Sequence, residues 1–218
     1  MPEPVLDLMV FIDVICPWCY VGKRRLEKAL AMIGPDAPIR VTWRPFELNP
    51  DMPPEGMERR LYRMRKFGSM ERSQQLDAQL TDLGVQEGLR FRYDLMIRTP
   101  NTFNAHRLIW LAGQGGGQDA VVEALMRAYF TEGRDIGDSE TLADVASQAG
   151  MDRAHTIDFL EGEDGAAEVR AYEDAARRAG ISGVPAFIAN RRPLLMGAQP
   201  PDVIASALRG VLDLTPAE

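Results

Sequence analysis

The two cysteines of this 218-residue chain lie three positions apart, in the segment Cys16-Pro17-Trp18-Cys19. A mostly apolar run over 10–15 precedes them, and a helical pattern begins directly after them. This spacing places both thiols at the start of one helix, where unpaired backbone N–H groups and the positive end of the helix dipole favour a thiolate at Cys16. Pro17 suits the first helical position because its φ is already fixed. Cys19 could then attack a mixed disulfide at Cys16, so the local pattern predicts dithiol–disulfide exchange.

The composition limits the class of protein. Hydrophobic residues make up 45% of the chain and charged residues 26%, with a net charge of −7. This composition is typical of one globular domain or of one domain with a large insertion, and the acidic balance argues against a general nucleic-acid binder. No stretch approaches the roughly 20 apolar residues of a membrane span. The start of the chain, 1–7, lacks the basic region of a signal peptide. We therefore expect a cytoplasmic protein that binds neither nucleic acid nor membrane, and in the reducing cytosol a C-x-x-C is more often catalytic or metal-binding than structural.

The elements that position the cysteines follow from periodicity and punctuation. A strand over 6–13, a helix over 19–33 ended by Gly34-Pro35, and a strand over 39–46 form a βαβ unit, for which parallel pairing is the default. Strand patterns return at 184–189 and 193–196, joined by a hairpin-like turn at 190–192, and a last helix covers 201–211. We therefore expect an α/β fold whose mixed sheet comes from 1–50 and 181–218, with an all-helical insertion over 51–180. The insertion is predicted to hold helices over 57–66, 70–87, 102–112, 120–130, 139–148, 153–159 and 168–179.

Three segments taken together resemble a known family: CPWCYVGK at 16–23, PNTFNAHR at 100–107 and GISGVPAF at 180–187. Over nearly its whole length the chain resembles thioredoxin-fold oxidoreductases of the DsbA family, and within them the FrnE-like branch. The resemblance implies a thioredoxin-like fold with a large helical insertion and thiol–disulfide oxidoreductase activity, with disulfide isomerase or chaperone-like action on proteins as further roles. A sister group shares the scaffold: the glutathione-dependent 2-hydroxychromene-2-carboxylate isomerases and kappa-class glutathione transferases. Its members typically carry Ser where Cys16 stands, so two cysteines favour the disulfide branch.

The resemblance also implies roles for residues around the dithiol. It predicts a cis bond at Val184–Pro185 facing the cysteines, with the Val184 backbone pairing with an extended substrate or with glutathione. From the residues alone, a trans proline opening an edge strand is the ordinary reading. Trp18 either packs at an exposed helix start or tunes the pair, and it stands where strongly oxidising members carry His, which implies a less oxidising couple.

For several other residues the sequence allows both a structural and a functional role. The cysteines could be half of a zinc site or inert buried thiols, but His106 and His155, the remaining candidate ligands, are far away in sequence. Asn101 could cap a helix with His106 and Arg107 on a solvated face; the resemblance suggests instead that this helix covers the active site and that Asn101 and His106 contact substrate. A basic run is either exposed helix surface or a docking patch for an acidic partner or for the carboxylates of glutathione: Arg59, Arg60, Arg63, Arg65 and Lys66. Asp13, near the end of the first strand, could accept the Cys19 proton.

The sequence therefore predicts a disulfide oxidoreductase in which Cys16 and Cys19 react. The substrate-binding residues are expected to be Pro17, Trp18, Val184, Pro185, Asn101 and His106. No metal or cofactor is expected, apart from glutathione as a redox partner or co-substrate, and the substrate is a disulfide-containing protein or a small thiol. Two alternatives remain: a glutathione-dependent isomerase or transferase, and a redox-gated chaperone.

Overall fold

The computed structural model describes residues 6–213, so the ends of the expected thioredoxin-like part, 1–5 and 214–218, lie outside the described residues. Within 6–213, the main sheet has four strands in the order β2-β1-β5-β6. Strand β1 (Leu6–Ile12) pairs in parallel with β2 (Ile39–Pro45), as the βαβ pattern predicts, and antiparallel with β5 (Ala186–Ala189). Strand β6 (Arg192–Met196) completes the hairpin.

Both faces of β1 are buried, which explains why this strand reads as a nearly continuous apolar run. Alternate residues point to opposite faces of a sheet. Leu8, Val10 and Ile12 belong to the large core beneath the sheet. Met9 and Phe11 pack instead in a smaller cluster on the other face. The sheet is therefore the middle layer of the fold.

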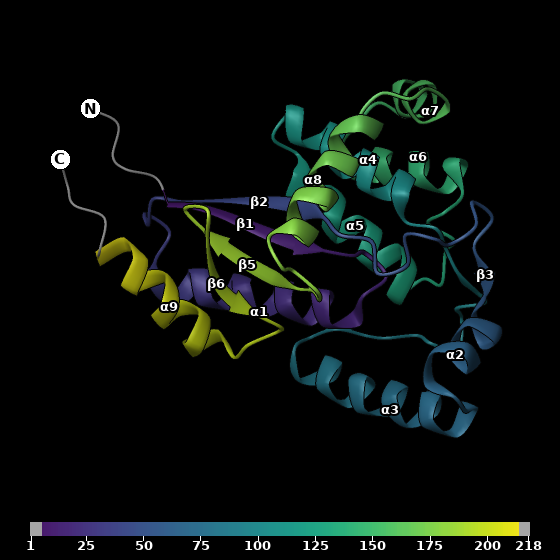
Figure 1. Ribbon diagram of the computed structural model, residues 1–218, viewed down its shortest axis with the longest axis horizontal. Coiled ribbons are helices and arrows are strands. Elements are labelled where there is room, and N and C mark those ends of the chain that lie inside the picture. Colours follow the sequence, from purple (N-terminus) through teal and green to yellow (C-terminus); the bar gives the residue numbers. More distant parts are fainter. Residues whose placement is uncertain (1–5, 214–218) are drawn as a thin grey trace.

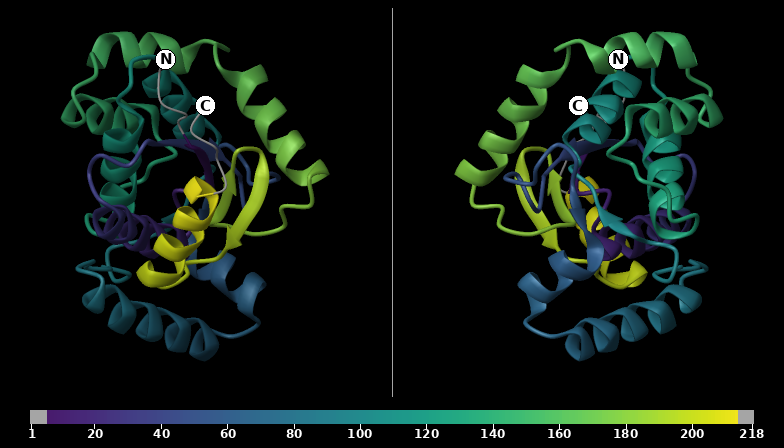
Figure 2. Two further views of the ribbon diagram at one scale, coloured as in Figure 1. Left: turned by 90° about the vertical axis from the view of Figure 1, so that its left-hand side faces the viewer. Right: turned by 90° about the vertical axis from the view of Figure 1, so that its right-hand side faces the viewer.

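Helices cover both faces of the sheet. Helix α1 (Pro17–Ile33) packs with α9 (Pro201–Asp213) on one face, and α8 (Ala166–Arg178) lies on the opposite face (Figures 1 and 2). The remaining helices of the stretch between β2 and β5 gather beyond the sheet and beside β2, apart from a helical pair, α2 and α3, that lies below the rest in Figure 1. Their bounds are α2 Arg59–Phe67, α3 Met70–Gln86, α4 Phe103–Gln114, α5 Gln118–Phe130, α6 Ser139–Gln148 and α7 Arg153–Glu161. This arrangement confirms the mixed sheet with a helical insertion.

Local capping sets the ends of several helices. The side chains of Ser69, Asp138 and Asp152 accept bonds from backbone N–H groups three residues on, at 3.1, 2.8 and 2.7 Å. Such bonds satisfy donors that a helix start leaves unpaired. Helix α1 ends at Gly34, whose φ is +122° and whose N–H donates to the Leu30 carbonyl. The cap of α6 is therefore Asp138, one residue before the expected opening at Ser139.

Several boundaries differ by one or two residues from the sequence-based prediction. Helix α1 begins at Pro17 and not at residue 19, because proline is already in helical φ at the first position. Residues 57–58 belong to no helix, since β3 (Met57–Glu58) pairs antiparallel with β4 (Arg98–Thr99), about forty residues along the chain, and no local signal marks such a pair. Residues 184–185 precede β5 and do not belong to it.

Strand β2 lies at an edge of the sheet, and a side chain takes the place of a neighbouring strand. Gln118, at the start of α5, accepts from the Trp43 N–H at 2.8 Å and donates to the Trp43 carbonyl at 3.0 Å. The Trp43 ring N–H also donates to Asp119 at 3.1 Å. These bonds cover a strand edge that would otherwise offer unpaired groups. Between residues 6 and 213, no helix has both the length and the apolar character needed to span a membrane.

Candidate active site

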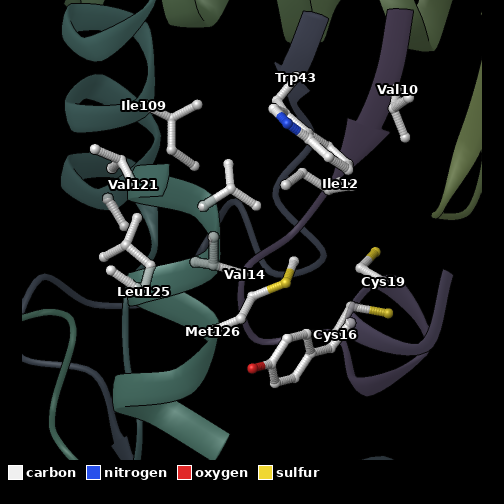
Figure 3. Close-up of a cluster of buried hydrophobic side chains, with 14 of the residues drawn as sticks. Val10, Ile12, Val14, Cys16, Cys19, Trp43, Ile109, Val121, Leu125 and Met126 are labelled. Carbon is white, nitrogen blue, oxygen red and sulfur yellow. The ribbon is translucent and has the colours of Figure 1, made fainter. Parts of the chain in front are cut away.

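The two thiols lie at the start of α1, directly after β1. Cys16 is the N-cap of the helix: its backbone N–H donates to the Asp13 carbonyl at 3.0 Å, and its carbonyl accepts from the Cys19 N–H at 3.0 Å. Both cysteines are free, and Figure 3 shows their sulfur atoms close together with Met126 of α5 nearby. The short loop from β1 to α1 therefore brings both thiols to the end of the sheet.

The environments of the two sulfurs differ. Cys16 lines a pocket, whereas Cys19 has no exposed surface at all. Burial raises the pKa of the Cys19 thiol well above its ordinary value, and the neighbouring Cys16 raises it further. A molecule entering from the pocket meets the Cys16 sulfur first, and the Cys19 sulfur is enclosed by the protein.

A loop from a distant part of the chain covers Cys16. The Val184–Pro185 peptide bond is cis, and the Cys16 sulfur lies 3.7 Å from the Val184 carbonyl oxygen. The Pro185 carbonyl accepts from the Gly197 N–H at 2.8 Å, which ties the loop to the end of β6. The loop also packs directly on α1 at Gly22, where an added Cβ would lie 2.8 Å from the Pro185 Cγ. The absence of a side chain at Gly22 thus sets how closely the loop approaches the thiols.

A cavity of about 280 Å³ opens beside Cys16, between the start of α1 and the helical pair α2–α3. Pro17 and the half-exposed Trp18 form its α1 side. Its lining is mostly apolar and aromatic and includes Ile15, Leu48, Leu76, Leu80, Met96 and Phe130. Arg59, Arg63 and Lys66 of α2 also line it. The pocket therefore combines an apolar floor with positive charge on one wall.

Comparisons with known proteins identify the family of this chain. A family model described as a DSBA-like thioredoxin domain matches residues 7–209. The chain belongs to this family. A probable DsbA oxidoreductase from Streptomyces coelicolor is 34% identical and superposes with a TM-score of 0.89, over 98% of this chain and 93% of that one. The uncharacterized protein YwbO of Bacillus subtilis is 25% identical over 211 residues, which is 93% of this chain and 96% of its own length.

A more distant solved structure shares the fold alone. The cytosolic disulfide reductase DsbM from Pseudomonas aeruginosa, solved with GSH, is 21% identical with a TM-score of 0.64, over 95% of this chain and 99% of that one. The family model that matches residues 7–209 confirms the membership of the DsbA family that the three sequence segments predict.

Asn101 does not line the pocket of the cysteines. Its amide N–H donates to the Met52 carbonyl at 2.7 Å, and its side-chain oxygen accepts from the Phe103 N–H at 2.9 Å. It thus pairs with the first backbone N–H of α4 and holds the loop before α2, and it lines a separate, larger cavity. The N-cap of α4 is Thr102 and not Asn101, and contact of Asn101 with substrate at the thiols stays a prediction.

The expectation that His106 and Arg107 lie on a solvated face is wrong, because both side chains are buried. His106 lies beneath the loop after β1, with its Nε2 3.6 Å from an Asp13 carboxylate oxygen. Arg107 turns the other way and donates to the carbonyls of Phe159, Leu160, Gly162 and Asp164. The 3.6-residue period does not reveal this burial, because polar side chains normally indicate the exposed face of a helix.

The basic run divides into two parts. Arg59 and Arg63 are mostly buried and share Asp77 of α3, at 2.8 and 2.6 Å. Lys66 is exposed at the pocket and donates to the Tyr62 hydroxyl at 2.6 Å, while Arg60 and Arg65 are exposed. Part of the run is therefore surface, and part of it forms the charged wall of the pocket.

An ionic cluster fixes α1 against α5, and sequence reasoning did not find it. Lys23 is almost fully buried and contacts Glu27, Asp119 and Glu123 within 3.4 Å. The Tyr20 hydroxyl also donates to Glu123, at 2.9 Å. Buried charges need such partners, and these contacts hold the first turns of the helix that carries the thiols.

A zinc site at the two cysteines would need further ligands nearby. Across residues 6–213, no three His, Cys, Asp or Glu side chains gather in a way that could hold a metal ion. His155 lies in the first turn of α7, where its N–H donates to Asp152.

Proposed function

We propose that this chain is a thiol–disulfide oxidoreductase in which Cys16 is the attacking thiol and Cys19 the resolving one. One observation carries the proposal: two free thiols share the start of α1, with Cys16 at a pocket and Cys19 fully buried behind it. The free N–H groups of the helix start favour negative charge at the N-cap position that Cys16 occupies. Family membership supports the same activity.

The exchange proceeds in two displacements. The Cys16 thiolate attacks one sulfur of a substrate disulfide, a Cys16–substrate disulfide forms, and the other substrate sulfur leaves as a thiolate. The Cys19 thiolate then attacks the Cys16 sulfur, and the second substrate sulfur leaves as the Cys16–Cys19 disulfide forms. The substrate gains two electrons and the dithiol loses them, and the reverse sequence oxidises a dithiol substrate.

The surroundings of Cys16 support two kinds of substrate contact. The Val184 carbonyl oxygen lies 3.7 Å from the Cys16 sulfur, and this nearness supports pairing of the Val184 backbone with an extended peptide or with the backbone of glutathione. The cavity of about 280 Å³ suits a small thiol, and Lys66 with the two arginines would attract its carboxylates. Glutathione fits both features as redox partner or co-substrate, and DsbM, which shares the fold, was solved with GSH. Action as a disulfide isomerase is an extension of the same chemistry.

The first experiment is a redox titration in glutathione buffers with thiol trapping and mass measurement. An intramolecular Cys16–Cys19 disulfide that forms and disappears as a single two-electron couple is the expected result. A persistent glutathione adduct on Cys16 without that disulfide would overturn the proposal and favour a glutathione-dependent isomerase or transferase.

Cysteine variants then separate the two thiols. Cys16→Ser is expected to abolish turnover, and Cys19→Ser to accumulate mixed disulfides with substrate. A Cys19→Ser protein that turns over normally would rule out the resolving role. Client binding that persists in the double variant would indicate instead a chaperone function independent of the dithiol.

A further inference from the structure

A second cavity, of about 540 Å³, opens in the helical part of the molecule. Its walls come from the loop after β2, the start of α4, the end of α7 and the helix α8. It shares no lining residue with the pocket beside Cys16. Its volume falls in the range of small-molecule sites in proteins. The cavity is therefore large enough for a ligand that takes no part in the exchange at the thiols.

Two buried carboxyl groups line this cavity, and we call them the carboxyl pair: Glu47 after β2, 5% exposed, and Glu173 of α8, 6% exposed. A Glu173 oxygen accepts from the Glu47 backbone N–H at 2.5 Å. Between residues 6 and 213, one carboxyl oxygen of Glu47 is buried without a hydrogen-bond partner. Such atoms are rare in proteins because leaving them unpaired is unfavourable. The cavity thus holds a strong acceptor that the protein itself does not use.

The cations of the chain that lie near the carboxyl pair are bound elsewhere. Arg107 donates to backbone carbonyls of 159–164, and Arg170 lies over the ring of Phe103, 4.7 Å from its centre. Arg177 donates to the backbone carbonyl of Glu47, at 3.1 Å, and not to its carboxyl group. Within the described part of the chain, neither member of the pair forms an ion pair with a lysine or an arginine. Buried carboxylates normally need such a partner.

Without a cation, the carboxyl pair is held together by a proton. Burial raises the pKa of Glu47 to about 8; the charge of His106 opposes this, while the charges of Glu173 and Asp13 and a side-chain hydrogen bond with Glu173 add to it. Two carboxyl groups can form such a bond only if one of them is protonated. Burial would lower the pKa of His106, but Asp13, Glu173 and Glu47 raise it overall. At neutral pH the pair therefore carries a proton that another cation could replace.

The remaining lining suits an organic cation. Apolar side chains form much of it: Pro50, Pro54, Phe103 and Leu160. Two exposed carboxylates, Glu161 and Glu163, lie at the same cavity and would attract positive charge. A bare metal ion fits less well, because no three ligating side chains gather among the residues that the structure describes. The donor set and the lining together favour a positive group attached to an apolar body.

We propose that the second cavity binds a small organic cation, a primary ammonium group on an apolar stem, with the ammonium seated on the carboxyl pair. Its N–H groups donate to the unpartnered Glu47 oxygen and to Glu173, and the proton of the pair passes to solvent. Charge-assisted bonds of this kind are the strong ones in proteins. The stem lies against Phe103 and Leu160. The site is separate from the dithiol, so the inference does not depend on the proposed function.

The test uses phenethylammonium as the probe and phenethyl alcohol as its neutral match in shape. Titration calorimetry in two buffers of different ionisation enthalpy gives both the affinity and the number of protons released. At neutral pH the ammonium should bind at least about tenfold more tightly than the alcohol, with release of nearly one proton, since Glu47 is mostly protonated there. Its affinity should rise about tenfold from pH 6 to 7 and level off above about pH 8, because the bound form requires an ionised pair.

Three variants locate the site. Glu47→Gln keeps the size of the side chain but removes its charge, so at about pH 8 it should weaken ammonium binding by at least about tenfold and abolish the dependence on pH. Glu161→Gln, which removes an exposed carboxylate at the same cavity, is the matched control and should stay within about twofold of the wild type. Cys16→Ser should bind the ammonium as tightly as the wild type does.

Several results would overturn the proposal. They are equal affinity for the ammonium and the alcohol, binding without proton release, unchanged affinity in Glu47→Gln, and loss of binding in Cys16→Ser, which would move the ligand to the pocket of the thiols. If Glu47→Gln folds poorly, the proton release by the wild type in the two buffers decides the question by itself.

Discussion

Two glycines in helices provide a matched test of how the Pro185 loop is held. Gly22 is buried in α1, and a Cβ there would lie 2.8 Å from the Pro185 Cγ. Gly210 is exposed in α9, and a Cβ there would meet no atom within 4 Å. Replacement of glycine by alanine inside a helix normally stabilises the folded state by about 0.5–1 kcal/mol. The same substitution should therefore have opposite effects at the two positions.

The expected magnitudes follow from these contacts. Gly210→Ala should gain the full helix preference of about 0.5–1 kcal/mol, which raises Tm by roughly 1–4 °C for a chain of this size. At Gly22 the same gain is opposed by overpacking, which costs about 1–3 kcal/mol. The Pro185 ring is rigid and its carbonyl is bound by Gly197, so it cannot yield easily. Gly22→Ala should lower the free energy of unfolding by about 1–2 kcal/mol.

Urea unfolding of the reduced proteins, followed by circular dichroism, measures both changes. The rate at which the reduced protein releases the first coloured thiolate from an aromatic disulfide adds a functional readout, because a displaced loop moves the Val184 carbonyl away from the Cys16 sulfur. We expect Gly22→Ala to slow that release and Gly210→Ala to leave it unchanged. If Gly22→Ala stabilised the protein as much as Gly210→Ala, the close approach of the loop to α1 would be refuted.

Three further predictions concern stability. Arg107→Lys should lower the free energy of unfolding by about 2–4 kcal/mol, because lysine cannot reach all the carbonyls that the buried guanidinium binds; an unchanged urea midpoint would contradict this. Glu47 has a pKa raised from 4.5 to about 8 in the folded state, so its contribution to stability should be lost as pH rises from about 4.5 to about 8. At about 1.4 kcal/mol per unit this is a few kcal/mol, and Glu47→Gln should flatten the measured slope of unfolding free energy against pH; equal slopes would argue against a protonated Glu47. Arg191 holds a φ of +64° in the β5–β6 turn, after Asn190, so Arg191→Gly should stabilise by about 0.5–1 kcal/mol in thermal melts, and a lower Tm would count against the strain.

Local chemistry determined much of this protein from the sequence. The apolar run before the C-x-x-C, Pro17 at the first helical position and Gly34 after the last turn are signals within a few residues of one another. They sufficed to predict β1, α1 and the position of both thiols. The parallel pairing of β1 with β2 also followed, because a strand–helix–strand unit has one strongly preferred handedness. The prediction of a DsbA-like fold came from the resemblance of three short segments, far apart in the chain, to that family.

The tertiary structure decided what surrounds the thiols. Four separate parts of the chain contribute buried ionisable side chains behind the thiols: Asp13, Glu47, His106 and Glu173. No pattern within one helix or strand specifies that they meet. The same holds for Gln118 on the edge of β2. The physical reason is that local preference depends on neighbours along the chain, whereas the burial and protonation of a polar side chain depend on what packs against it. The sequence could therefore place the two sulfurs, and only the folded chain could say which ionisable groups are buried near them.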